Sequence, residues 1–320
     1  MATGEGRTPR ISVVMPVRDG EAYLAEAVES ILSQTFADFE FIIIDDGSKD
    51  RTPDILKEFA KRHSRIRLHR IEGRGIVAAL NLGIAVAQSE YIARMDADDI
   101  ALPQRFAVQL EQMDADPDLL VLGSAAIEID TNGAETGRSR LVAGSGDVRA
   151  ALAFRCALIH PTVLARREPV VAVGGYRQAL TYAEDYDLWL RLARIGPLAN
   201  SAEPLLKLRR HPTQISRIRS LEQRGAAALA RRLAFDRAEP VKIELGGSPG
   251  QAMAEHLRSR HRSRKPISDS EAKDLSVMLR ACSRLGTMDT RSMREIGSRI
   301  VSEGRLPRGW ILPLKLWLRW

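Results

Sequence analysis

Three aspartates, Asp96, Asp98 and Asp99, stand within four positions directly after an apolar run at residues 91–95. Carboxylates this close together repel one another, and a hard divalent cation is the usual relief of that repulsion. Mg²⁺ and Mn²⁺ need only one or two aspartates, because they keep coordination positions for water and phosphate oxygens. The spacing therefore predicts a Mn²⁺ or Mg²⁺ site that binds a diphosphate, and a solvated turn that caps the next helix is the alternative.

A second acidic pair, Glu184 and Asp185, precedes residues 186–193, whose apolar side chains recur at helical spacing. The amide groups at a helix N-terminus favour carboxylates, so capping alone would explain the pair. A carboxylate within hydrogen-bond reach of a substrate hydroxyl can also act as a general base. The residues by themselves leave both interpretations open.

The predicted elements that carry these residues alternate between strands and helices. Apolar runs predict strands at 11–15, 39–44, 66–71, 90–95 and 119–129, and amphipathic patterns predict helices at 24–32, 53–63, 76–89 and from Pro103 onwards. Thr52 is the predicted N-cap of the second helix. Alternation at this spacing predicts an α/β fold with a mostly parallel sheet and helices on both faces.

Three of the predicted strands end in conspicuous residues: Pro-Val-Arg at 16–18, Asp-Asp-Gly-Ser at 45–48 and Asp-Ala-Asp-Asp at 96–99. Ligands of such sheets bind at the carboxyl ends of the strands, so we expect these residues to converge on one crevice. No G-x-G-x-x-G follows the first strand, which argues against a dehydrogenase. The glycine-rich, basic phosphate loop of a sugar nucleotidyltransferase is missing from the same place.

The composition is that of a globular protein from a reducing compartment. Apolar residues make up 44% of the 320 residues and charged residues 28%, which excludes wholesale disorder. Cys156 and Cys282 lie far apart, which excludes a disulfide framework and a thiolate zinc site. Residues 1–10 are polar and expected to be disordered, and we expect neither a secretion signal nor a bilayer-spanning segment. The predicted location is cytoplasmic.

The positive charge is concentrated near the end of the chain. Residues 1–250 carry a net charge of −1 and residues 251–320 a net charge of +8. Tryptophan, aliphatic residues and cations crowd residues 305–320, a composition that suits an anionic membrane surface on the inner face of the cell membrane. Docking on the catalytic domain or on another subunit is the alternative. The basic run lacks interleaved aromatics, so we expect no nucleic-acid partner.

Breaker residues indicate the organisation of the chain. Residues 131–146 are rich in Gly, Ser and Thr and predict a mobile loop, and the Pro and Gly of 239–251 predict a linker. Ser268 and Glu271 are placed as a capping box for a later helix. The expected parts are a catalytic domain at 11–238, with halves at 11–130 and 147–220, and a basic helical region at 251–320.

Seven motifs together resemble glycosyltransferase family 2. They run in order from Ile11 to Ser216, and include Ile-Asp-Asp-Gly-Ser at 44–48, Glu-Tyr-Ile-Ala-Arg-Met-Asp-Ala-Asp-Asp at 90–99 and Glu-Asp-Tyr-Asp-Leu-Trp-Leu-Arg at 184–191. The others lie at 11–20, 31–36, 79–84 and 209–216. The resemblance implies the GT-A nucleotide-binding fold, extended here by C-terminal helices. It also implies transfer of a sugar from a nucleoside diphosphate with inversion.

The resemblance further implies a donor site. Pro16, Val17 and Asp46 match positions that line the nucleoside, with the Asp46 carboxylate accepting the imino hydrogen of the base, although Asp45 can exchange roles with it. An Asx-turn is the structural alternative for Asp46. Asp96 matches the residue that holds the ribose. Arg74 is expected to approach the diphosphate, with an exposed loop arginine as the equal alternative.

The same resemblance assigns the reacting groups. Asp98 matches the metal ligand, and His211 matches a late histidine that reaches the metal or the diphosphate. Asp99 is expected to cap the following helix. Asp185 occupies the position of the catalytic base. His160 either shapes the acceptor pocket or only packs.

We therefore expect an inverting hexosyltransferase that uses a nucleoside diphosphate sugar, most commonly a UDP-sugar, and a glycan or lipid-linked acceptor. A sugar nucleotidyltransferase-like enzyme and an inactive nucleotide-binding scaffold are the alternatives. Polysaccharide biosynthesis is the expected process, with peripheral membrane association through residues 305–320.

Overall fold

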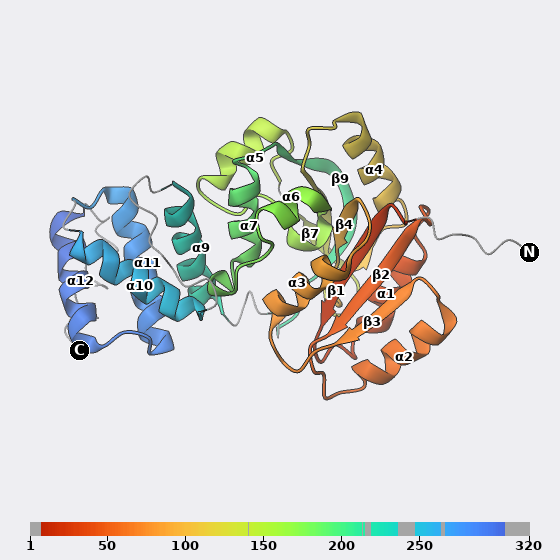
Figure 1. Ribbon diagram of the computed structural model, residues 1–320, viewed down its shortest axis with the longest axis horizontal. Helices are drawn as coiled ribbons and strands as arrows, with labels where there is room; N and C mark the ends of the chain where they lie inside the picture. The colour runs from red at the N-terminus through yellow and green to blue at the C-terminus, as the bar shows by residue number, and fades with distance from the viewer. Residues whose placement is uncertain are drawn as a thin grey trace, which may run out of the picture. The chain divides into compact units, whose positions relative to one another are not determined.

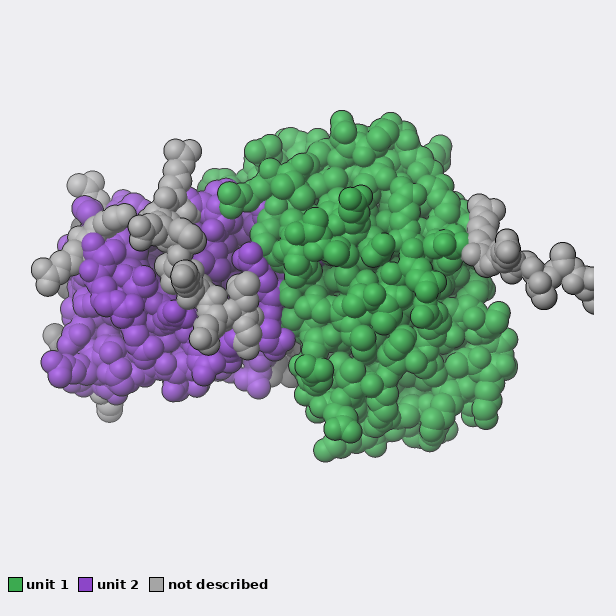
Figure 2. Space-filling view, in the orientation of Figure 1, with its two compact units in different colours: residues 1–176, 191–211 green, residues 177–190, 212–320 purple. Residues whose placement is uncertain are grey.

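The computed structural model describes residues 8–139, 141–212, 214, 219–235, 247–263 and 266–304 (Figure 1). The chain divides into two compact units, which Figure 2 colours separately. Unit 1 contains Met1–Tyr176 and Arg191–His211, and unit 2 contains Arg177–Leu190 and Pro212–Trp320. The expected acceptor half at 147–220 is therefore shared between the units. The predicted tail at 305–320 and most of the predicted linker lie outside the described residues.

Unit 1 is built on one sheet, which has nine strands in the described part of the chain and the order β3-β2-β1-β4-β8-β6-β9-β5, with β7 paired to β6. The first four strands pair in parallel, and so do β6 and β9. The sheet turns antiparallel where β8 joins β4 and β6. The strands are β1 Ile11–Val17, β2 Phe39–Asp45, β3 Ile66–Arg70, β4 Tyr91–Arg94, β5 Ile100–Ala101, β6 Val121–Ile129, β7 Glu135–Arg138, β8 Leu164–Arg166 and β9 Leu198–Arg209.

Helices cover both faces of this sheet, as the alternating pattern predicts. One face of β1 packs in a single apolar core with α1 Leu24–Leu32, α2 Thr52–Arg62 and α4 Arg105–Ala115. The other face meets α3 Ile76–Val86, where Gly83 lies directly against Val14 and Ile44. Burial on both faces explains why β1 and β2 read as continuous apolar runs. The remaining elements of unit 1 are α5 Ser145–Leu152, η1 His160–Thr162 and α6 Arg167–Ala172.

Two local expectations are wrong. Thr52 is not the N-cap of α2, because Arg51 precedes the helix without a side-chain cap and the Thr52 hydroxyl instead accepts a hydrogen bond from the Gly20 amide. Residues 131–146 are not only a loop, because β7 pairs with β6 there. The Asp130 carboxylate accepts hydrogen bonds from the Asn132 and Ala134 amides and forms the hairpin turn. Since β7 is exposed throughout, it has no apolar alternation to reveal it.

Unit 2 is helical in its described residues. Its elements are η2 Gln178–Leu180, most of α7 Glu184–Leu192, α9 Ser220–Phe235, α10 Pro249–Arg262, α11 Asp269–Leu285 and α12 Thr290–Glu303. The predicted capping box of Ser268 and Glu271 is confirmed at the start of α11. Basic residues form ion pairs inside the unit, since Arg231 and Arg232 both contact Asp274. No helix in the described ranges combines the length and apolarity that a membrane crossing requires.

We expect Gly83→Ala to destabilise unit 1. A Cβ at this position would lie 2.3 Å from Val14 Cγ1 and 3.1 Å from Ile44 Cδ1, so α3 must move off the sheet. Overpacking of this kind costs about 1–3 kcal/mol, which urea unfolding followed by circular dichroism measures. Gly146→Ala in α5 is the matched control, because nothing lies within 4 Å of its Cβ position. Equal loss in both variants would contradict the packing argument.

Candidate active site

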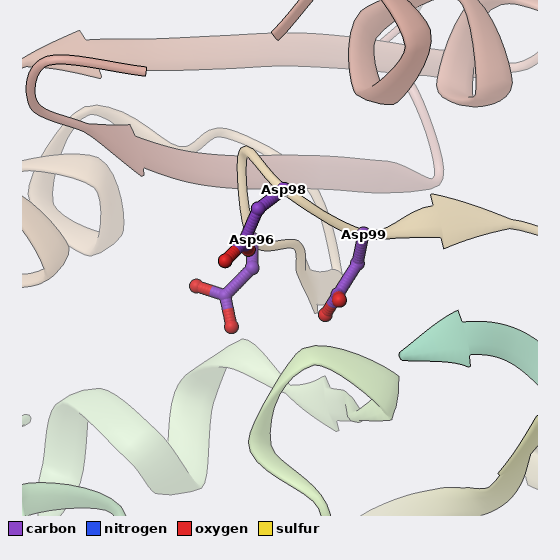
Figure 3. Close-up of side chains that lie close together, drawn as sticks. All are labelled: Asp96, Asp98 and Asp99. Atoms are coloured by element: carbon purple, nitrogen blue, oxygen red, sulfur yellow. The ribbon is translucent and has the colours of Figure 1, made fainter. Parts of the chain in front are cut away.

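The three aspartates of the loop between β4 and β5 lie together, as predicted. One carboxylate oxygen from each of Asp96, Asp98 and Asp99 falls within 4.8 Å of the other two. Figure 3 shows the three side chains pointing to the same side of the loop. The loop leaves the sheet at the carboxyl end of β4, beside the ends of β1 and β2, since these strands run parallel. Three negative charges are thus concentrated at the edge where such sheets bind ligands.

Two buried arginines lie beneath this cluster. Arg94, 4% exposed, forms an ion pair with Asp96. Burial alone would lower the pKa of the Arg94 guanidinium, but the charge and the hydrogen bond of Asp96, together with smaller contributions from Tyr176 and Asp99, leave that pKa raised. Arg105 is fully buried and donates hydrogen bonds to the Arg94 and Val163 carbonyls. Burial, and then the Arg94 charge, lower the pKa of Arg105 to about 9, so it remains charged at neutral pH.

Asp99 is the most deeply buried member of the cluster, at 1% exposure. Its Oδ1 accepts a hydrogen bond of 2.8 Å from the Arg209 amide, while its Oδ2 has no hydrogen-bond partner among the described residues. Burial, and then the charges of Asp96 and Asp98, raise its pKa well above the ordinary value. The expected capping role is wrong, because β5 intervenes and α4 begins after Gln104 without a side-chain cap.

Asp98 contacts the predicted second ligand, His211. The His211 Nε2 lies 2.8 Å from Asp98 Oδ2. Burial and the charge of Asp96 raise the pKa of Asp98, and the His211 hydrogen bond opposes them. Carboxylate oxygens and an imidazole nitrogen suit Mn²⁺ or Mg²⁺. The buried Asp99 Oδ2 without a described partner also fits a cation at this place, so these residues could hold the predicted ion.

The predicted nucleoside residues lie at the ends of β1 and β2. Pro16 and Val17 pair in register with Ile44 and Asp45, and the Asp46 amide donates a 2.8 Å hydrogen bond to the Val17 carbonyl. All of them are buried. The sheet therefore brings Pro16, Val17 and Asp46 together, as the sequence predicts.

Asp45, the last residue of β2, and Asp46, which directly follows it, bind different segments of the chain. Asp46 accepts hydrogen bonds from the Arg74 and Gly75 amides at 2.7 and 2.9 Å, whereas Asp45 accepts one from the Ser48 amide and one from the Arg70 guanidinium. The loop that contains Gly73 packs closely against Gly47, since a Cβ on Gly47 would lie 2.9 Å from the Gly73 amide nitrogen. Gly47 and Gly73 both have positive φ. The Arg74 side chain is exposed, and its backbone rather than its guanidinium contacts Asp46.

Reciprocal hydrogen bonds join the loop after β1 to the loop after β2. Backbone amides of each loop donate to side chains of the other: Asp19 to Ser48, Gly20 to Thr52, Glu21 to Asp50, Lys49 to Asp19 and Arg51 to Glu21. The sequence signals only a polar turn here. The five contacts fix the two strand ends relative to each other.

Asp185 belongs to unit 2, whereas the carboxylate cluster belongs to unit 1. It lies in the first turn of α7, and its Oδ1 accepts a 2.7 Å hydrogen bond from the Tyr186 amide. The other two acidic side chains of that turn are buried: Glu184 is 8% exposed, and Asp187, 2% exposed, pairs with Arg177 at 3.5 Å. Asp185 is therefore the most accessible carboxylate of the turn.

His160 and Tyr176 form a contact that the sequence does not reveal. His160 Nε2 lies 2.7 Å from the Tyr176 hydroxyl. Burial, and then the Arg94 charge, lower the pKa of His160 well below its ordinary value, so its ring is neutral at physiological pH. Its neutrality lets it accept the Tyr176 hydroxyl hydrogen. Gly174 and Gly175, both with positive φ, mark the turn that presents Tyr176.

The chain is similar to known glycosyltransferases. The model of the family described as Glycosyl transferase family 2 matches residues 12–169. The O-antigen biosynthesis glycosyltransferase WbnJ of Escherichia coli is 32% identical over 205 residues, which are 63% of this chain and 80% of WbnJ.

Two solved structures share the fold. TarS 1-349 of S. aureus, in complex with UDP-GlcNAc, has a TM-score of 0.58 and 16% identity, covering 92% of this chain and 84% of TarS 1-349. The mannosyltransferase PcManGT from Pyrobaculum calidifontis, in complex with GDP-Man and Mn²⁺, has a TM-score of 0.50 and 17% identity, covering 98% of this chain and 84% of PcManGT. The predicted GT-A fold with C-terminal helices is confirmed.

We expect Asp99→Asn to stabilise the metal-free protein at neutral pH, because a buried negative charge beside two others is unfavourable. The amide removes a buried negative charge and keeps an oxygen for the Arg209 amide. Because the folded-state pKa of Asp99 is raised above 3.8, its contribution to stability is present below that pH and is lost as the pH rises. The advantage of the variant should therefore grow from about pH 4 upwards in urea unfolding with chelator present.

Asp114→Asn provides a control of opposite sign. The hydrogen bonds of Arg10 lower the pKa of Asp114, so its contribution to stability exists above pH 3.8 and is lost as the pH falls. This variant should be slightly less stable than the wild type at neutral pH and equal to it in acid. An Asp99→Asn protein that also loses stability as the pH rises, relative to the wild type, would contradict the assigned repulsion.

Proposed function

Because the chain belongs to glycosyltransferase family 2 and is a glycosyltransferase, we propose that it is an inverting, metal-assisted hexosyltransferase. Its donor is a nucleoside diphosphate sugar, and its acceptor is a hydroxyl group of a glycan or of a lipid-linked sugar. The observation that carries the proposal is the cluster of Asp96, Asp98 and Asp99 at the carboxyl end of β4, with His211 against Asp98.

The proposed donor site lies along the ends of β1, β2 and β4. Pro16 and Val17 line the nucleoside, Asp96 binds the ribose, and Arg74 approaches the diphosphate. Asp46 accepts the imino hydrogen of the base. Its two oxygens each accept one loop amide, and a carboxylate oxygen has a second lone pair for a further donor. UDP is the nucleotide we propose, and the UDP-GlcNAc complex of TarS supports it by shared fold.

The proposed metal ligands are Asp98 and His211. A bound Mn²⁺ or Mg²⁺ neutralises charge on the departing diphosphate. The chain's own part is to hold the ion and the ribose at fixed places: Asp99 and Arg209 tie the aspartate loop to β9, and Arg94 fixes Asp96. The Mn²⁺ in the PcManGT complex supports a divalent ion in this fold.

The proposed base is Asp185. The acceptor hydroxyl transfers its proton to Asp185 while its oxygen attacks the anomeric carbon, opposite the departing diphosphate, so the configuration inverts. The Tyr186 amide donates to Oδ1 of this carboxylate. Accessibility supports this choice, since Glu184 and Asp187 of the same turn are buried.

The proposed cellular role is based on the amino-acid composition of residues 305–320, which lie outside the described residues. We propose that residues 305–320, rich in tryptophan and cations, bind an anionic membrane surface at the inner face of the cell membrane. A lipid-linked acceptor of polysaccharide biosynthesis would be present there. The O-antigen assignment of WbnJ supports this class of acceptor.

Asp185→Asn should lower kcat by about 10²–10⁴-fold, the usual contribution of a positioned base. The amide keeps an oxygen for the Tyr186 amide, and the melting temperature of the variant shows whether it is folded. Release of nucleoside diphosphate from a panel of UDP-, GDP- and dTDP-hexoses, with Mn²⁺ and a glycan acceptor, measures the rate. Asp118→Asn, an exposed site in unit 1, controls for the chemical change. Full turnover in Asp185→Asn would contradict the assignment of Asp185 as the base. If the wild type turns over none of the donors, the inactive nucleotide-binding scaffold is favoured instead.

Removal of divalent ions with a chelator should abolish turnover and the thermal stabilisation by UDP. A ligand at 100 times its dissociation constant stabilises by about 2.7 kcal/mol, so differential scanning fluorimetry with UDP and Mn²⁺ detects binding. Asp98→Asn should lose most of the Mn²⁺-dependent shift, whereas Asp118→Asn should retain it. Activity that survives complete chelation would contradict metal assistance.

A further inference from the structure

Arg209, the last residue of β9, contacts the metal-site loop through both backbone and side chain. Its amide donates to Asp99 Oδ1 at 2.8 Å, and its Nε donates to the Asp98 carbonyl at 2.9 Å. Its Nη1 lies 3.3 Å from the Asp130 carbonyl and 3.4 Å from the Thr131 carbonyl. The side chain is only 2% exposed. Arg209 thus fixes the backbone from which Asp98 projects.

Tyr23, the N-cap residue of α1, and Glu26 in its first turn contact the Arg209 guanidinium. The guanidinium carbon lies 4.4 Å from the centre of the Tyr23 ring, and Nη2 forms an ion pair with Glu26. The Tyr23 ring is also a neighbour of His211, with ring centres 5.6 Å apart. One aromatic ring therefore supports both the arginine behind Asp98 and the histidine in contact with Asp98.

Contacts of this kind are strong enough to affect the metal ligands that they hold. A cation over an aromatic face contributes about 0.5–2 kcal/mol, and a nearly buried guanidinium requires a carboxylate partner. Partners that orient metal ligands, without touching the metal, typically change metal affinity by 10–100-fold. Tyr23 and Glu26 stand in that relation to His211 and Asp98.

We propose that Tyr23 and Glu26 are positioning residues of the metal site, which hold Arg209 and His211 so that Asp98 and His211 face one cation. The inference rests on the proposed metal-assisted function and extends it to α1. Neither residue belongs to the apolar core face of α1: Glu26 is 54% exposed, and the buried apolar residues of the helix are Leu24, Ala27, Val28 and Ile31.

The test measures Mn²⁺ affinity of the full chain without any turnover. Titration of the metal-free protein with Mn²⁺, with and without UDP, is followed through the electron paramagnetic resonance signal of free Mn²⁺. Tyr23→Leu and Glu26→Gln should each weaken Mn²⁺ binding about tenfold or more. Tyr23→Phe should bind as the wild type does, because the contacts with Arg209 and His211 use the ring and not the hydroxyl.

Glu29→Gln is the matched control, since Glu29 is exposed on the same helix and no contact of its side chain with the site is observed among the described residues. Melting temperatures of the metal-free variants show whether each protein is folded. Glu26→Gln changes an exposed side chain, so it provides the test even where Tyr23→Leu fails to fold.

Equal Mn²⁺ affinity in the wild type, Tyr23→Leu and Glu26→Gln would overturn the inference and leave the proposed function intact. Mn²⁺ binding that is as weak in Tyr23→Phe as in Tyr23→Leu would overturn it as well, because the aromatic ring would then not be what holds Arg209 and His211. A wild-type protein that binds no Mn²⁺, with or without UDP, would overturn the metal-assisted function and this inference together.

Discussion

The repulsion among Asp96, Asp98 and Asp99 is the constraint around which unit 1 is arranged. Their oxygens fall within 4.8 Å of one another, and the pKa values of Asp98 and Asp99 are raised, first by burial and then by neighbouring negative charge. Two arginines offset the negative charge of the cluster. Arg94 pairs with Asp96, and Arg209 binds the loop backbone while Glu26 balances its own charge. Residues from β4, β9 and α1 thus converge around the cluster.

Two buried side chains of α4, Arg105 and Gln109, bind the backbone where the strand direction of the sheet changes. At β4 the sheet changes from parallel to antiparallel, and side chains of α4 donate hydrogen bonds to backbone carbonyls near this change. Arg105 donates to the carbonyls of Arg94 and Val163, and Gln109 donates to those of Leu122 and Thr162. Since an unpaired buried carbonyl costs about 1–3 kcal/mol, this pair stabilises the strand end from which the aspartates project. The same pair keeps Arg94 in place beside Asp96.

The sequence predicts the parts of the fold whose signals are local. Strands β1 and β2 are buried on both faces and appear as apolar runs, and the three aspartates are neighbours in the chain. β5 has two residues, and β7 is fully exposed, so neither has a periodicity to detect. The role of Arg209 depends on Asp99, 110 positions away, and no pattern of single residues encodes such a contact. The expectation that Asp99 caps the following helix fails for a similar reason: its hydrogen-bond partner lies on β9, and nothing in the sequence around Asp99 indicates that strand.

Stability and ligand binding oppose each other at this cluster. Asp99 is almost completely buried and keeps an oxygen that no described residue hydrogen-bonds, which a turn with a purely structural role would not require. Residues that break the rule of satisfied burial concentrate at functional sites, where a ligand supplies the missing partner. A cation between the aspartates would remove the repulsion and satisfy the buried oxygen at once. The free energy that the metal-free protein stores in the cluster would then become binding energy for the ion, which is why contacts as remote as Tyr23 and Glu26 matter: they prevent the loop from relaxing and dissipating it.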